Sequence, residues 1–223
     1  MNFFNNFWDN VLHIDKILEP LVTTQPFWSY FILAFIIFAE TAFVVTAFLP
    51  SDVILFAACS LMMVHRGCFN PFILIPLFYI SAVLGDSLNF AIGRFFKKEV
   101  NKTGKILFIK TENLEKTNII FEKSGGTAVV CSRFVPLLRS LVPFVTGVSD
   151  EEYKWFLKRN MIGVGIWTVL YCSLGVLFGQ INFVKEHFGL VAIAVCLLCI
   201  VTASISFVVR KLILEKKDKR KGK

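Results

Sequence analysis

Four charged residues lie in stretches of sequence that are otherwise apolar: Glu40, Asp52, Arg133 and Arg139. A charged side chain at the centre of a bilayer costs roughly 2.5–3.5 kcal/mol, so such residues are candidates for function. Arginine stays protonated and presents a planar fork of donors that suits phosphate oxygens, whereas carboxylates can take up and release protons. We therefore predict that the two arginines bind an anionic lipid headgroup and that the two acids couple its movement to protons.

Each of these residues also has a structural interpretation. Asp52 follows Ser51 directly after Pro50, a pattern typical of a helix cap. The two arginines could extend to the membrane surface, as long basic side chains do. Two acids and two bases could also simply offset one another as buried pairs.

The spacing of the four residues indicates that the backbone must break between them. Glu40 and Asp52 would lie about 18 Å apart on one continuous helix, and Arg133 and Arg139 would lie on different faces. Pro50 and Pro136 provide a break within each pair, and broken half-helices are a known way to build a transport site at mid-membrane. We thus expect two re-entrant hairpins, and whether their charged residues meet in one site stays open.

The composition requires a membrane protein with several spans. Of 223 residues, 56% are hydrophobic and 18% charged, and the apolar residues form long runs. The net charge of +8 is concentrated in two basic blocks that directly follow apolar runs, which is typical of juxtamembrane segments and not of nucleic-acid binding. The six cysteines and three histidines form no metal-binding pattern, so we expect no metal and no cofactor.

The pattern predicts an all-α, polytopic protein with four kinds of segment. Residues 1–26 form an interfacial amphipathic segment, and residues 27–209 form the membrane domain. Within that domain we expect re-entrant hairpins at about 27–64 and 127–148, spans at about 71–93, 160–180 and 188–209, and a surface helix over 112–124. Residues 210–223 form a basic tail.

The basic residues then fix the orientation. With hairpins that return to their own side, the 94–123 block, the 150–159 segment and the tail all lie on one side. The positive-inside rule makes that side, and the C-terminus, cytoplasmic. Asp86 is predicted nearer the cytoplasmic end of its span, where it could pair with Arg94 or with a hairpin arginine.

Several stretches resemble the DedA family, also called the SNARE-associated or VTT-domain family. They are AETAFVVTAFLPSDVILFAA, GDSLNFAIGRFF, FEKSGGTAVVCSRFVPLLRSLVPFVTGVS and FLKRNMIGVGIWTVLYCSLGVLFG. The resemblance implies two facing re-entrant hairpins, a bacterial inner-membrane location and a link to the proton motive force. Some members are proposed to return undecaprenyl phosphate across the membrane. The family's functional acids and arginines correspond to Glu40, Asp52, Arg133 and Arg139.

Two functions follow from these residues and from the resemblance. The first is a proton-coupled transporter, or flippase, for a lipid phosphate such as undecaprenyl phosphate or a phospholipid. The alternative is a cation/proton exchanger that contributes to proton-motive-force homeostasis. An enzyme is not expected, because no histidine lies deep in an apolar run beside a serine or cysteine. The lipid, the coupling ion, the direction of transport and the formation of a homo-oligomer stay open.

Overall fold

The computed structural model describes residues 26–44, 51–64, 69–103, 105–106, 109–110, 126–149, 151–178 and 181. Within these ranges the protein is helical except for one ladder of two residues per strand, β1 (Lys105–Ile106) with β2 (Ile109–Lys110). The expected all-α class is confirmed for this part of the chain. The interfacial segment before Pro26, the 112–124 helix, the span at 188–209 and the 210–223 tail lie outside the described residues.

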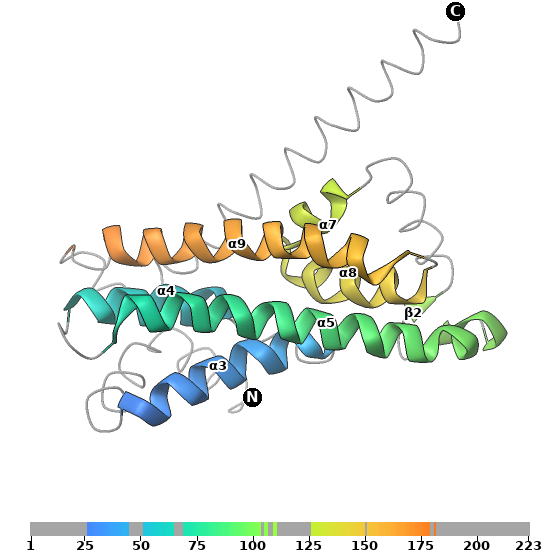
Figure 1. The fold of residues 1–223 in the computed structure, drawn as a ribbon, viewed down its shortest axis with the longest axis horizontal. Coiled ribbons are helices and arrows are strands. Elements are labelled where there is room, and N and C mark those ends of the chain that lie inside the picture. Colours follow the sequence, from blue (N-terminus) through green and yellow to red (C-terminus); the bar gives the residue numbers. More distant parts are fainter. Residues whose placement is uncertain are drawn as a thin grey trace, which may run out of the picture.

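Two long helices form the centre of the molecule. Helix α5 (Pro71–Thr103) and helix α9 (Tyr153–Phe178) contain apolar stretches long enough to cross a membrane, over Pro71–Lys97 and Tyr153–Phe178. At 1.5 Å per residue both stretches exceed the roughly 30 Å hydrocarbon core. The helices run beside each other in opposite directions (Figure 1). Both are longer than predicted: α5 continues through the basic residues after Gly93, and α9 begins before Asn160.

The remaining helices are too short to cross the bilayer. They are α3 (Pro26–Ala42), α4 (Ser51–Val64), α7 (Thr127–Ser132) and α8 (Pro136–Val148). The longest, α3, has 17 residues and spans about 26 Å. Helix α3 runs from one end of the molecule to its middle, and α4 runs from the middle back toward the same end (Figure 1). The predicted interruptions at 27–64 and 127–148 are therefore present as helix–break–helix segments.

The second interruption is defined in detail. Helix α7 ends at Ser132, Val135 has extended backbone angles, and Pro136 is the first residue of α8. A proline fits this position because the first turn of a helix has no partner for its missing N–H. The break therefore falls between Arg133 and Arg139, as the spacing predicted.

Apolar side chains form two separate clusters. The larger one joins α3, α4, the first half of α5 and the second half of α9 around Phe56, Phe78 and Trp167. The smaller one joins α5, α7, α8 and the start of α9 around Phe90, Phe144 and Phe156. The end of α3, the start of α4 and the start of α8 come together between the clusters.

Candidate functional site

The sequence-predicted charges converge where the helices break. Glu40 lies near the C-terminal end of α3, Asp52 in the first turn of α4, and Arg139 in the first turn of α8. Each comes from a different helix, and together they meet at the middle of the molecule. Three of the four charged residues singled out in the sequence therefore lie together in the fold.

Arg139 is the centre of this group. Its Nη1 donates to Asp52 Oδ1 at 2.9 Å, and its Nη2 pairs with Glu40 Oε1. The guanidinium fork therefore joins two carboxylates that lie on separate helices. The Arg139 side chain is only 3% exposed and Glu40 is fully buried, so both charges are removed from the surface.

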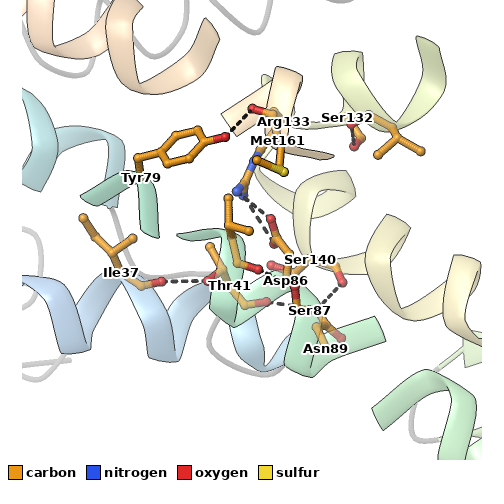
Figure 2. A network of polar contacts seen from close by, with 12 residues as sticks. Ile37, Thr41, Tyr79, Asp86, Ser87, Asn89, Ser132, Arg133, Ser140 and Met161 are labelled. Carbon is orange, nitrogen blue, oxygen red and sulfur yellow. Dashed lines mark hydrogen bonds and ion pairs between the residues drawn. The ribbon is translucent and has the colours of Figure 1, made fainter. Parts of the chain in front are cut away.

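Arg133 forms a second pair, with an acid of the long helix α5. Its two terminal nitrogens contact the two Asp86 oxygens, at 3.4 Å for Nη1–Oδ1 and 2.6 Å for Nη2–Oδ2 (Figure 2). Arg133 Nε is buried without a hydrogen-bond partner among the described residues. Asp86 lies near the middle of the apolar Pro71–Lys97 stretch, which extends beyond the 71–93 span predicted from the sequence.

The structure decides between the two predicted partners of Asp86, and it contradicts one interpretation of the arginines. Of the two partners considered for Asp86, the structure selects the hairpin arginine. Arg94 instead donates to the carbonyl oxygens of Ser149 and Glu151, at 3.4 and 3.0 Å. Both hairpin arginines point inward and are 3% exposed, so the interpretation in which they extend to the membrane surface is wrong.

Trp167 links the two ion-paired groups, and the sequence did not identify it. Its indole Nε1 donates to Asp52 Oδ1 at 2.8 Å, and the Arg133 guanidinium carbon lies 5.6 Å from the centre of its ring. A tryptophan in an apolar run is usually a packing residue or part of the aromatic belt at the membrane surface. A signal was its place in the stretch FLKRNMIGVGIWTVLY, but a lone tryptophan in an apolar run does not reveal its partner.

Asn89 is a second residue that does not stand out in the sequence. Its amide nitrogen donates to the backbone oxygen of Thr41 at 3.1 Å and to that of Ser140 at 2.8 Å (Figure 2). Thr41 directly follows Glu40, and Ser140 directly follows Arg139. One buried amide on α5 therefore holds the backbone beside both members of the Arg139–Glu40 pair.

Ser51 and Pro50, the two residues before Asp52, were also predicted to support the site. Ser51 is fully buried as the first residue of α4, and its hydroxyl has no hydrogen-bond partner among the described residues. Pro50 lies outside the described residues. Asp52 does stand in the first turn of α4, but its Oδ1 accepts from Arg139 and Trp167, so it is part of the charged site.

The charge of the assembled site is unbalanced. Three carboxylates, from Glu40, Asp52 and Asp86, face two guanidinium groups, which leaves one formal negative charge in the interior. Uptake of a single proton would make the group neutral. Buried charges are costly unless they are paired, so this group is chemically suited to bind a proton or to exchange a carboxylate for another anion. Within the part of the chain that the structure describes, no cluster of side chains is suited to hold a metal ion.

Comparisons of the sequence with family models and with individual proteins agree on one family. The VTT domain matches residues 49–177. Protein DedA of Escherichia coli K12 is 34% identical over 203 residues, which are 91% of this chain and 93% of DedA. An uncharacterised membrane protein of Mycobacterium tuberculosis H37Rv is 30% identical over 77% of this chain and 75% of its own length. Inner membrane protein YghB of Escherichia coli K12 is 25% identical over 71% of each chain. No solved structure matches at a significant level.

Proposed function

The chain belongs to the VTT-domain family of membrane proteins, and we propose that it carries a lipid phosphate across the bilayer through its buried arginine–carboxylate site. The cargo is undecaprenyl phosphate or a phospholipid, and protons drive or balance its movement. No chemical conversion of the lipid is part of this proposal. The membrane is the bacterial inner membrane, and the basic ends of the helices face the cytoplasm.

The observation that carries the proposal is the Arg139 guanidinium held between Glu40 and Asp52. Two oxygens of a tetrahedral phosphate can accept from a guanidinium as the oxygens of a carboxylate do, so a phosphate can replace one of the carboxylates on Arg139. The released carboxylate would then be left in the interior without its partner. Protonation of that carboxylate removes the cost of an unpaired buried charge, which links phosphate binding to proton uptake.

Two further features support this cargo. Arg133 Nε is a buried donor with no hydrogen-bond partner in the described residues, and it could serve a further acceptor oxygen. The short helices α3, α4, α7 and α8 support a pair of re-entrant segments, since each is too short to cross the bilayer. Their breaks lie at the middle of the molecule, where transport sites of this construction are found.

The experiment is transbilayer movement of fluorescently labelled undecaprenyl phosphate in proteoliposomes, with and without a pH gradient. We expect wild-type protein to move the lipid and to respond to the gradient. Arg139→Ala should abolish movement, and Glu40→Gln should remove the response to the gradient. Lys154→Gln, at an exposed position on α9, serves as the matched control and should behave as wild type.

The alternative of a cation/proton exchanger is favoured by one observation, the formal excess of one carboxylate in the site. It predicts cation-dependent proton flux in liposomes that contain no lipid phosphate. Such flux from wild type, abolished in Glu40→Gln and in Asp52→Asn, together with no lipid movement, would replace the transporter by the exchanger.

A further inference from the structure

The described helices pack as two layers, and each interrupted segment is divided between them. Helices α3 and α8 pack mainly on α5, whereas α4 and α7 pack mainly on α9. We name these the α5 layer (α3, α5 and α8) and the α9 layer (α4, α7 and α9). The arms of the first segment, α3 and α4, thus belong to different layers, and so do α7 and α8.

Within the α5 layer the helices approach through glycines. A Cβ on Gly93 would collide with the carbonyl oxygen of Phe144, and a Cβ on Gly147 would collide with that of Phe90. A Cβ on Gly85 would collide with the carbonyl oxygen of Phe38 in α3 and with the Thr41 hydroxyl. Contacts of this kind bring backbones together and leave little room for sliding. The two bonds from Asn89 add a direct link from α5 to α3 and α8.

The α9 layer is built by the same means. A Cβ on Gly175 would lie 2.6 Å from the carbonyl oxygen of Phe56 in α4, and one on Gly163 would lie 3.2 Å from Cα of Val130 in α7. Asp52 of α4 also accepts the indole N–H of Trp167 in α9. Each layer is therefore joined internally by close backbone contacts and by a buried hydrogen bond.

Contacts between the layers are made by side chains. The Tyr79 hydroxyl of α5 donates to the carbonyl oxygen of Met161 in α9 at 3.3 Å, and the Tyr153 hydroxyl of α9 donates to the Ser87 hydroxyl of α5 at 3.0 Å. The aromatic rings of Phe90 and Phe156 stack at 4.9 Å, and a Cβ on Gly165 would meet only the ring of Tyr79, at an ordinary 3.7 Å. Side chains of this type can rearrange without moving a backbone. The charged contacts that cross between layers are Arg139–Asp52 and Arg133–Asp86.

We propose that the Arg133–Asp86 and Arg139–Asp52 pairs are latches between two rigid layers, and that the layers separate when these pairs are broken. Asp86 is then a positioning residue that holds the site closed at rest. The Arg139–Glu40 pair joins α8 to α3 inside the α5 layer and does not bridge the two layers. The cargo in this scheme rests on the proposed function: its phosphate replaces Asp86 and Asp52 on the arginines and so opens the layers.

The test measures distances between spin labels in the full chain, reconstituted in phosphatidylcholine vesicles. Its six native cysteines are first replaced. The interlayer pair is Leu84→Cys on α5 with Val169→Cys on α9, whose native side chains are 55% and 62% exposed. The matched control pair lies within the α5 layer, Phe35→Cys on α3 with Leu84→Cys. Both pairs are measured by pulsed electron paramagnetic resonance.

We expect Asp86→Asn to add a longer-distance population to the interlayer pair and to leave the control pair unchanged. Combination with Asp52→Asn should enlarge that population, since both latches are then broken. The exchange of Asp86→Arg with Arg133→Asp should restore the single short distance. An unchanged interlayer distance in the double variant, or an equal change in the control pair, would overturn the inference.

Adding undecaprenyl phosphate to wild type separates this inference from the proposed function. A longer interlayer distance with the lipid supports both. Opening in the latch variants without any response of wild type to the lipid would retain the layers and reject the cargo. Lipid movement by wild type without any interlayer change in the variants would retain the transporter and reject the latches.

Discussion

At the scale of single residues, the pairing of Arg139 with two acids explains why the site is both stable and reactive. A guanidinium that satisfies two buried carboxylates offsets much of the cost of burying all three groups. The same arrangement is sensitive to the loss of any one member, because the remaining charges cannot reach water. The side chains that we propose to bind the cargo also stabilise the site, so experiments must separate the two roles.

Neutralising the whole Arg139 group should separate stability from transport. Arg139→Ala leaves Glu40 and Asp52 buried without their partner, and we expect a loss of about 3–5 kcal/mol of stability. The triple variant Arg139→Met, Glu40→Gln, Asp52→Asn removes all three charges and should recover most of that loss while transporting nothing. Denaturant unfolding in detergent and the vesicle assay measure the two properties. A triple variant as unstable as Arg139→Ala would contradict this account.

Trp167 should contribute through its N–H and not through its size alone. Trp167→Phe keeps a ring near Arg133 but removes the donor to Asp52, and a hydrogen bond to a charged group contributes about 1.5–3 kcal/mol. We expect a loss in that range, measured by unfolding in detergent. Trp28→Phe is the control, since Trp28 is 55% exposed and should change stability little. Equal effects of the two substitutions would show that the indole N–H does not matter.

The sequence identified the charged residues of the site and one possible partner of Asp86, but not the uncharged residues that contact them. Glu40, Asp52, Arg133 and Arg139 stand out because a charge in an apolar run is expensive. Trp167 and Asn89 do not stand out, because a tryptophan or asparagine in such a run has many ordinary explanations. Their roles depend on which helices meet, and that is decided by packing between residues far apart in the chain.

At the scale of elements, the helix breaks were predictable and the helix lengths were not. Pro136 excludes a regular helix through the 127–148 stretch, and the structure has its break there. The end of α5 was less evident, because helix formation continues past the apolar residues into the basic stretch. Hydropathy reports where a segment meets the membrane, whereas the backbone can remain helical beyond that point.

Glycines where α5 meets α8 should be much less tolerant than glycines where α5 meets α9. Gly93→Ala places a Cβ against the backbone of Phe144, and overpacking of this kind costs about 1–3 kcal/mol. Gly165→Ala meets only the Tyr79 ring at 3.7 Å and should be neutral or slightly stabilising. Thermal unfolding in detergent compares the two. Similar losses at both sites would remove the distinction between backbone contacts and side-chain contacts.

At the scale of the whole molecule, the charged site separates two apolar clusters. The larger cluster includes the first interrupted segment, and the smaller one includes the second. The breaks face each other between them, so the charges lie at about half the length of α5 and α9. This placement could not be derived from the sequence, since it depends on how the two segments fold back along the same pair of helices.

The two ends of α9 should be reachable from opposite sides of the membrane. Lys154 and Ile181 are exposed residues beside the first and last turns of α9, and the 26-residue helix between them spans about 39 Å. The first turns of α9, whose sequence includes Lys154, Lys158 and Arg159, lie toward the same end of the molecule as the last turns of α5 (Figure 1). A cysteine at either end, in a cysteine-free background, can be labelled with a maleimide that does not cross membranes.

We expect Lys154→Cys to react only in inside-out vesicles and Ile181→Cys only in right-side-out vesicles. The reverse pattern would invert the protein in the membrane, and reaction of both from one side would exclude α9 as a span.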